Sequence, residues 1–285
     1  MTGRKIPSAK KQPCRARTLR RHLTLFVLAV SLAHSVPAAN IPAEPNMFSF
    51  QNGEVLRYKV KWGFIRLATI ELSQKALGPS LPAQYEVLLK IKETRLKSTL
   101  NPSSLASQVF LQEEGGERTR RVTCRYEPDS GLIAMEEREA ERVIARKTVP
   151  FEGVYVDLVG LIMAMRSFCS SAARVSLPTV VGCALGSTDL RFAADAQPIK
   201  LGIFRQAVLA RYMTGRTDWK ALGGVSGPIE AWLSDDAAAV PLKIRLNSSL
   251  GRVTLELEAI QRLDWPSPPA ASPAGSTARG EAFRP

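Results

Sequence analysis

Apolar and polar residues alternate along most of the chain between residues 50 and 263, which is the period of β-strands with one buried face. The alternation is clearest in Val240–Leu246 and Arg252–Ile260. Residues 247–251 between them contain Asn, Ser and Gly, which favour a turn. The two segments carry outward charges of opposite sign, so they predict an antiparallel hairpin with one apolar face and one solvated face.

The same period of two predicts strands through the rest of this region. These strands are Glu54–Trp62, Ile65–Leu72, Tyr85–Ile91, Ala106–Leu111, Thr119–Tyr126, Leu132–Met135, Val143–Thr148, Ser187–Phe192, Arg205–Met213 and Pro228–Leu233.

One segment has the helical period instead. Asp157 is a good N-cap residue, and Leu158, Leu161, Ile162 and Met165 follow at the spacing of one apolar stripe. A single amphipathic helix among many strands needs a sheet face to cover, so we expect it across the concave side or one open end of the sheet. The predicted fold is therefore mainly β: an antiparallel curved sheet that closes into a barrel-like or half-barrel body, with one amphipathic capping helix.

The N-terminal residues have the three parts of a signal peptide. A basic segment at 1–22 precedes the apolar Leu23–Ala33, and small residues follow at 36–39. Eleven apolar residues are too few to span a bilayer unaided, although an uncleaved N-terminal anchor is the alternative. We predict a signal peptide at 1–39 and export to the periplasm or outer envelope of a Gram-negative-type bacterium. The general secretory route is favoured, and the Arg20-Arg21 pair leaves twin-arginine export as an alternative.

The rest of the chain divides into two parts. Residues 40–263 are predicted to form a single β-rich domain, without an integral membrane span in the mature chain. Residues 264–285 are rich in Pro, Ala and Ser, with few large apolar residues. Such a segment cannot bury enough surface to offset its chain entropy, so we predict a disordered tail.

The charge distribution argues against a nucleic-acid partner. Eight of the positive charges behind the net charge of +13 lie in residues 1–39, which leaves +5 for the remainder. That remainder has no long run of Lys and Arg, so it lacks the basic patch that phosphate binding requires.

The mature chain has no histidine, because His22 and His34 both fall in the predicted signal peptide. This excludes Ser-His-Asp and Cys-His nucleophile systems and zinc sites with His ligands. Nucleotide-binding glycine motifs are missing as well. We therefore predict a non-enzymatic protein with no cofactor and no metal.

Three cysteines remain after processing. Cys169 and Cys183 enclose a short segment, and export would allow a disulfide between them. Cys124 lies in an alternating segment and is interpreted as a small buried side chain, although a disulfide that involves it stays open.

Three stretches of the chain resemble an exported bacterial family, the domain-of-unknown-function family 3108. The matching positions are Gly53, Glu54, Leu56, Tyr58, Val60, Trp62 and Gly63 in the first stretch, Asp157 and Arg166 in the second, and Trp232–Asp236, Val240, Pro241 and Gly251 in the third. The chain departs from the family pattern at Leu67-Ala68, where a small Ala-Gly pair is usual. The resemblance implies an envelope protein with an antiparallel barrel-like or half-barrel sheet, and it implies no activity.

Several residues are candidates for a site. Tyr58, Trp62, Leu161, Met165 and Trp232 are predicted to line a ligand site, with plain core packing as the alternative.

Two acidic positions each have two interpretations. Ser234-Asp235-Asp236 offers adjacent carboxylates for a hard cation, but a hairpin turn is the favoured interpretation. Glu54 would suit a general acid if buried, but an ion pair with Lys or Arg on a neighbouring strand is favoured.

Three functions remain open at this point. The first is a binding protein or carrier for a lipid or another apolar or amphipathic ligand. The second is a structural or assembly partner of other envelope proteins, which would use sheet edges or the charged outer face. The third is a carboxylate-dependent glycan hydrolase, which requires two inward acids separated by about 5–9.5 Å in a polar cleft.

Overall fold

The structure is a computed structural model. It describes residues 50–78, 84–115, 119–127, 129–151, 153–170, 174–181, 184–220, 226–248, 251–263 and 265. The predicted signal peptide at 1–39, Cys183 and the tail at 264–285 apart from Trp265 lie outside these residues. Those predictions therefore stay predictions.

Fifteen strands and one helix make up the described part of the chain. The strands are β1 (Val55–Trp62), β2 (Ile65–Ala76), β3 (Tyr85–Ile91), β4 (Thr94–Leu100), β5 (Ser107–Glu114), β6 (Arg120–Glu127), β7 (Leu132–Glu139), β8 (Arg142–Pro150), β9 (Val156–Asp157), β10 (Arg174–Val181), β11 (Ala184–Ile199), β12 (Val208–Lys220), β13 (Ser226–Ser234), β14 (Pro241–Ser248) and β15 (Gly251–Gln261). The helix α1 spans Leu158–Phe168.

All of these strands belong to one sheet, in the order β8-β7-β6-β5-β4-β3-β2-β1-β15-β14-β13-β12-β11-β10-β9. Every pairing is antiparallel except that of the short β9 with β10, which is parallel. The β1–β15 pair joins the first and the last of these strands in the middle of the sheet. The strands β8 and β9 stand at opposite ends of this order and do not pair with each other, so the described sheet is not closed. The predicted mainly β, antiparallel half-barrel with one helix is confirmed.

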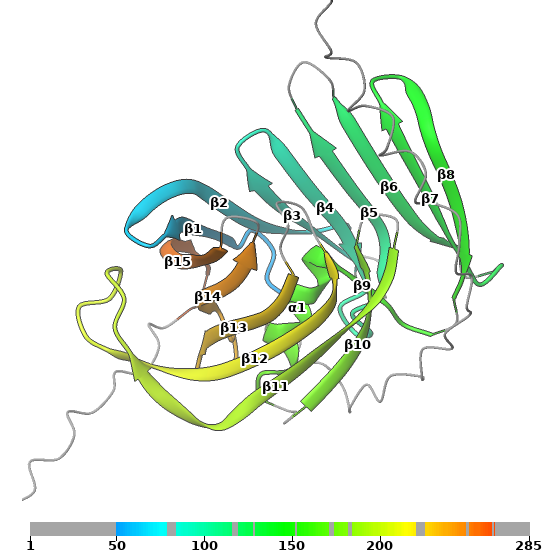
Figure 1. Ribbon diagram of the computed structural model, residues 1–285. Helices are drawn as coiled ribbons and strands as arrows, with labels where there is room; N and C mark the ends of the chain where they lie inside the picture. Colours follow the sequence, from blue (N-terminus) through cyan, green and yellow to red (C-terminus); the bar gives the residue numbers. More distant parts are fainter. Residues whose placement is uncertain are drawn as a thin grey trace, which may run out of the picture. The chain divides into compact units, whose positions relative to one another are not determined.

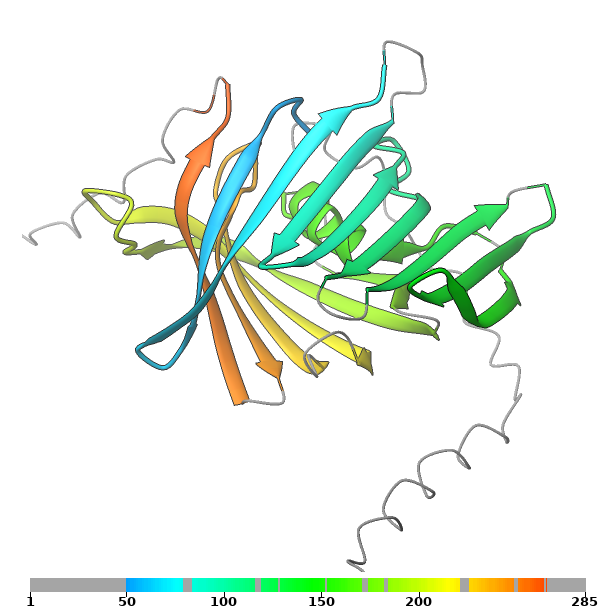
Figure 2. The ribbon, with the colours of Figure 1, turned by 90° about the horizontal axis from the view of Figure 1, so that it is seen from above.

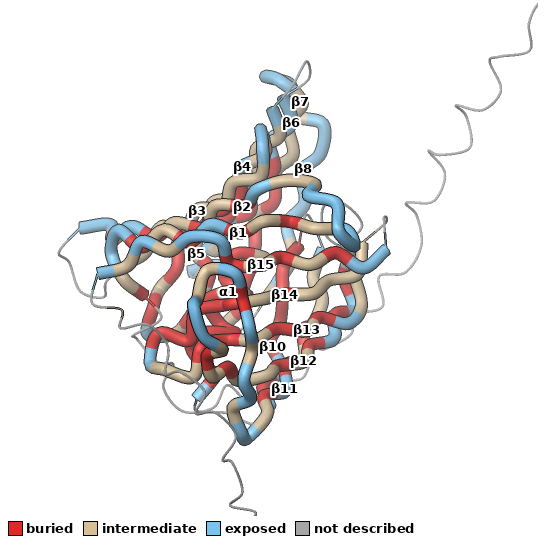
Figure 3. The backbone as a smooth tube through the Cα atoms, turned by 90° about the vertical axis from the view of Figure 1, so that its left-hand side faces the viewer, coloured by how far each residue is buried: buried red, intermediate tan, exposed pale blue. Residues whose placement is uncertain are grey.

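The sheet is strongly bent, and α1 lies in its concavity (Figures 1 and 2). Strand twist contributes to this bend, and β-bulges add to it locally. The pairing register shifts at Arg57/Tyr58 between β1 and β15, and at Val60/Lys61 between β1 and β2. Buried residues follow the strands that surround the helix (Figure 3).

Strand β1 shows how the alternating sequence produces this arrangement. Leu56, Tyr58 and Val60 are buried on the inner face, whereas Arg57 between them is exposed. On the outer face, Arg57 binds Glu71 of β2 at 3.0 Å. Such cross-strand ion pairs contribute only about 0.2–1 kcal/mol each, so burial of the inner face is the larger stabilising effect.

Two strands of ordinary length, β4 and β10, were not among the predicted strands. Buried residues run without interruption from Leu177 to Val181 in β10, so this strand lacks the alternation of a half-buried strand. Its inner face packs against α1, and Pro178 further obscures a strand pattern. Among the described residues, no helix is both long enough and apolar enough to cross a membrane.

Candidate functional site

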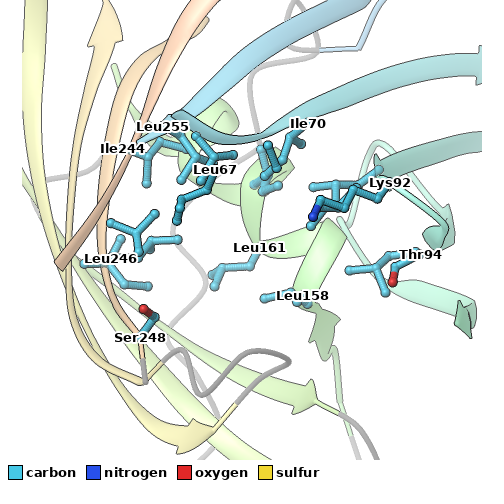
Figure 4. Close-up of a pocket in the computed structure, with 18 of the residues that line it drawn as sticks. Leu67, Ile70, Lys92, Thr94, Leu158, Leu161, Ile244, Leu246, Ser248 and Leu255 are labelled. Carbon is cyan, nitrogen blue, oxygen red and sulfur yellow. The ribbon is translucent and has the colours of Figure 1, made fainter. Parts of the chain in front are cut away.

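A cavity of about 860 Å³ lies between the concave face of the sheet and α1 (Figure 4). Aliphatic side chains from β1 to β4, from β13 to β15 and from α1 form most of its wall, together with Trp219 of β12. Ile70 stands on one side, and Ile244 and Leu255 on the other. This volume lies within the range of about 300–1,000 Å³ that is typical of small-molecule sites.

The helix contributes its whole apolar stripe to the cavity wall. Leu158, Leu161, Ile162 and Met165 all line the cavity, which is the face that the helical spacing predicts. Two of the predicted ligand-lining residues, Leu161 and Met165, therefore lie where a ligand in the cavity would contact them.

A β-bulge shapes the wall on β2. Val60 pairs with Ala68 while Lys61 pairs with Arg66, so Leu67 is the extra residue between them. A bulge lets two successive side chains turn toward the same face. Leu67 and Ala68 both line the cavity as a result. These are the two positions at which the chain departs from the pattern of the family that it resembles.

Polar groups of the cavity wall come mainly from hairpin turns. Lys92 and Glu93 form the β3–β4 turn, Thr94 begins β4, and Ser248 ends β14. Lys92 is exposed and has a positive φ of 52°. Its ammonium group extends toward the space between the labelled apolar side chains (Figure 4). Within the described part of the chain, Lys92 forms no ion pair, so its charge is available to a ligand.

Asp157 fixes the start of α1 against the sheet. Its Oδ1 accepts hydrogen bonds from the backbone N–H groups of Val159 (2.9 Å) and Gly160 (2.8 Å), which confirms the predicted N-cap. The Ser98 hydroxyl of β4 donates to Oδ2 at 2.5 Å. Burial raises the pKa of Asp157 above its ordinary value, and the hydrogen bonds from Gly160, Ser98 and Val159 offset only part of this rise.

A glycine allows the close approach of the helix to the sheet. A Cβ atom at Gly160 would lie 3.0 Å from the Ser107 Oγ and 3.2 Å from the Leu100 Cδ2. The backbone N–H of Asp157 donates to the same Ser107 Oγ at 2.9 Å. A larger residue at position 160 would therefore push α1 away from this polar anchor.

The other end of α1 is held by a buried ion-pair cluster. The guanidinium group of Arg166 donates to Glu54 Oε1 at 2.5 Å and to Oε2 at 2.9 Å, and both side chains are fully buried. Arg166 also donates to the carbonyl oxygen of Ala238 through Nε at 3.2 Å. Arg262 and Gln74 donate to the same Glu54 carboxylate. We call Glu54, Gln74, Arg166 and Arg262 the Glu54 cluster.

The two arginines keep Glu54 ionised. Burial alone would raise its pKa, but the charge of Arg166 and the hydrogen bonds from Arg166 and Arg262 outweigh burial and hold the pKa below its ordinary value. A carboxylate in this state has no proton to donate near neutral pH, which argues against the general-acid interpretation. The favoured interpretation, an ion pair, is correct, but the partners come from the helix and from the residue after β15 instead of a neighbouring strand.

The Ser234-Asp235-Asp236 segment is a turn. Asp236 Oδ1 accepts hydrogen bonds from the Ser234 hydroxyl (2.9 Å) and from the backbone N–H groups of Ala238 (2.9 Å) and Ala239 (3.0 Å). Asp235 binds Arg211 at 2.8 Å. Three or more potential ligands for a metal ion do not gather anywhere in the described ranges. The hairpin interpretation therefore accounts for these carboxylates.

Trp265 extends the packed body beyond the predicted boundary at Leu263. Its indole N–H donates to Asp236 Oδ2 at 2.9 Å, and its ring centroid lies 6.2 Å from that of Phe204. A single tryptophan at the start of a Pro-rich segment can pack in this way because its ring buries a large apolar area.

Three of the predicted ligand-lining residues lie away from the cavity wall. Tyr58 is buried on β1 near Glu54 and Arg166, and burial raises its pKa well above the ordinary value. Trp62 is 47% exposed at the end of β1. Trp232 faces outward, because it alternates with the buried Ala231 and Leu233, and the Arg245 guanidinium lies 4.9 Å from its ring centroid.

The cysteines are placed as follows. Cys169 caps the C-terminal end of α1 and is buried, it has no disulfide partner among the described residues, and burial raises the pKa of its thiol to about 12. Its predicted partner, Cys183, lies outside the described residues, so the disulfide stays a prediction. Cys124 is fully buried on β6, where its register partners are Phe110 and Met135.

The cavity wall does not offer the groups that a glycan hydrolase needs. Among the described residues that line it, Glu93 is the only carboxylate. Both glycosidase mechanisms use a pair of carboxylates that flank the scissile bond. The glycan-hydrolase alternative therefore has no support in this cavity.

Sequence reasoning missed two parts of this site. The Glu54 cluster joins residues that are up to 208 positions apart, and the bulge at Leu67 depends on strand register. One signal did point to the cluster. Arg166 follows Met165 and lies four residues after Ile162, so it extends the apolar stripe, and a charge in such a position requires a buried partner.

The chain is similar to a solved structure described as the crystal structure of a beta-barrel-like protein of domain of unknown function DUF1849 from Brucella abortus. The identity is 9% and the TM-score 0.46, over 75% of this chain and 99% of that chain. No curated protein matches. A family model described as "Protein of unknown function (DUF3108)" matches residues 57–258, and the chain belongs to this family.

Proposed function

We propose that this chain is a non-enzymatic protein of the bacterial envelope, exported to the periplasm or the outer envelope, that holds an apolar or amphipathic ligand in its cavity. The observation that carries this proposal is the cavity of about 860 Å³, whose wall is mostly aliphatic. The signal-peptide pattern of residues 1–39 supports the location.

The energetics of the cavity favour hydrocarbon over polar ligands. Each buried CH₂ group of a ligand contributes about 0.8 kcal/mol relative to water. Water gains little in such a space, because cavities lined by Leu and Ile offer few hydrogen-bond partners. A sugar or nucleotide would lose its hydration without compensation.

The polar turns beside the cavity supply a positive charge that could bind the head group of a ligand. Lys92 is a cation without an ion-pair partner in the described ranges, and it lies among the residues that line the cavity. A ligand with a hydrocarbon chain and an anionic head group would bury the chain against the strands and place the head near Lys92. The favoured ligand class is therefore an anionic amphiphile such as a fatty acid or a lipid with an acidic head.

The direct test is organic extraction of protein purified from the cell envelope, followed by mass spectrometry. The expected result is a stoichiometric amphiphile that is missing from an unrelated exported protein purified in the same way. Recovery of nothing above that control, together with no binding of added fatty acid, would reject the proposal.

Filling the cavity is expected to weaken binding. Ala68→Phe places a phenyl ring in the cavity, and the affinity for the neutral fluorescent probe N-phenyl-1-naphthylamine should fall at least about tenfold, or 1.4 kcal/mol. The matched control is Thr69→Phe, the neighbouring exposed position on the same strand, which should leave the affinity unchanged. Equal probe binding by Ala68→Phe and the wild type, measured by fluorescence titration, would contradict the cavity as the binding site.

Reversing the charge of Lys92 is expected to discriminate between head groups. Lys92→Glu should weaken the binding of the anionic probe cis-parinaric acid about fivefold or more, because an attraction at the surface becomes a repulsion. The neutral probe should bind as before. Lys90→Glu, on the outer face of β3 and two residues before Lys92, is the control. If both lysine variants affect parinaric acid equally, Lys92 has no special role.

A second function, assembly with another envelope protein, is favoured by the outer edge of β8, which pairs with no other strand among the described residues. This strand ends the sheet order, and most of its residues are exposed, including Ile144 at 47%. Such an edge can accept a strand from a partner. Chemical cross-linking in cells, with a Val143→Pro variant to block strand addition, would show a fixed partner that the variant loses.

A further inference from the structure

The turn between β1 and β2 exposes large apolar side chains. Phe64 is 96% exposed, Trp62 47% and Ile65 44%. Three of the six exposed large hydrophobic residues in the described part of the chain therefore lie within four consecutive positions. Scattered exposed apolar residues need no explanation, but a group of them at one tip marks an interaction site. We call Trp62, Phe64 and Ile65 the hairpin tip.

The backbone holds this tip in a defined shape. Trp62 pairs with Ile65, so Gly63 and Phe64 form a two-residue turn. Gly63 has φ +58° at the first turn position, where type II′ hairpin turns favour glycine. A turn this short leaves the Phe64 side chain no core to fold back onto. The sequence therefore presents an aromatic ring to solvent on a rigid support.

The hairpin tip lies beside the cavity. Trp62 pairs with Val253 of β15, and Val253 lines the cavity. A Cβ atom at Gly251 would lie 3.7 Å from the Trp62 Nε1, and Gly251 pairs with Ser248, which also lines the cavity. The β1–β2 turn and the start of β15 lie at the same end of their neighbouring strands (Figure 2).

Cations flank the tip, and some of them are paired with carboxylates while others are not. Lys61 and Arg66 stand directly opposite each other and are matched by Glu256 (2.8 Å) and Glu258 (2.8 Å). Arg252 is exposed one position before Val253, and it has no ion-pair partner among the residues that the structure describes. Arg252 near the tip and Lys92 at the cavity are therefore two cations without an ion-pair partner among the described residues.

We propose that the hairpin tip docks on an anionic lipid surface and brings the cavity to that surface. Tryptophan favours the membrane interface because its ring has an apolar body and a polar N–H group. Phenylalanine is wholly apolar, and it favours insertion below the head groups. Each nearby Lys or Arg adds about 1 kcal/mol of attraction to an anionic leaflet. The tip is too small for the roughly 800 Å² per partner that a stable protein interface buries. Membrane docking is a separate activity from ligand holding. Only the idea that docking lets a lipid enter the cavity rests on the proposed function.

The test is flotation of the purified full chain with vesicles of phosphatidylcholine alone or with 30% phosphatidylglycerol. The expected result is binding to the anionic vesicles that Phe64→Glu reduces about tenfold or more. Ile144→Glu is the matched control, because Ile144 is exposed to the same degree as Trp62 but lies on β8. Lipids with brominated chains should quench the fluorescence of the wild type, and Trp62→Phe should remove that quenching.

Binding of N-phenyl-1-naphthylamine, measured on the same samples, separates this proposal from ligand holding. Loss of vesicle binding with retained probe binding in Phe64→Glu supports a docking role for the tip. No binding of the wild type to anionic vesicles, equal binding by Phe64→Glu and the wild type, or equal binding to neutral vesicles would overturn it, whatever the cavity binds. A protein cross-linked at position 64 in cells, without vesicle binding, would replace the lipid surface with a protein partner.

Discussion

Replacement of Glu54 by Gln is expected to lower the free energy of unfolding by about 3–5 kcal/mol, since it leaves two arginines without their shared counter-charge. Glu54 and Arg166 are both fully buried, so water cannot compensate for the lost carboxylate. The measurement is urea unfolding followed by circular dichroism. Glu71→Gln is the matched control, because Glu71 forms an exposed ion pair with Arg57 and should cost less than about 1 kcal/mol.

The same pair of proteins should differ in acid sensitivity. The folded-state pKa of Glu54 lies below its ordinary value of 4.5, so its contribution to stability is fully present above that pH. The contribution is lost as the pH falls from 4.5 through the folded-state pKa. The stability difference between the wild type and Glu54→Gln should therefore be constant near neutral pH and shrink below pH 4.5. A difference that is independent of pH would contradict the ion-pair role.

Replacement of Asp157 by Ala is expected to cost about 2–4 kcal/mol. The loss of an N-cap costs about 0.5–2 kcal/mol, and a buried Ser98 hydroxyl without its acceptor adds about 1–3 kcal/mol. Asp157→Asn keeps a capping oxygen and should stay within about 1 kcal/mol of the wild type.

Two further measurements test this role of Asp157. Ser98→Ala combined with Asp157→Ala should cost less than the sum of the single changes, because both remove the same hydrogen bond. Because the folded-state pKa of Asp157 is raised, the stability that comes from its preferential protonation is fully present below the ordinary pKa of 3.8 and is lost as the pH rises through the folded-state pKa. Asp157→Asn should remove this pH dependence. Additive costs or an unchanged pH profile would show that Asp157 does not anchor the helix.

Local patterns were sufficient for most individual elements. The alternation in Tyr85–Ile91 gave the bounds of β3, and the spacing after Asp157 gave both the helix and its cavity-facing stripe. The prediction failed for β10, where α1 packs against the strand and a continuous run of buried residues, Thr179 among them, replaces the alternation. It also failed for the position of Trp232. Its large ring suggested burial, but Trp232 alternates with the buried Ala231 and Leu233 on β13 and therefore lies on the outer face.

What the sequence by itself determined is the period of most elements and the side that most of their residues face, because both follow from backbone geometry over a few residues. It also determined that histidine chemistry has no place in the predicted mature chain. Only the tertiary structure decided that the sheet curves around an apolar space, that Leu67 and Ala68 share one face, and that Arg166 meets Glu54. These features depend on strand register and on contacts between residues far apart in the chain. No local segment contains those contacts, so their stability comes from the packing of the whole domain.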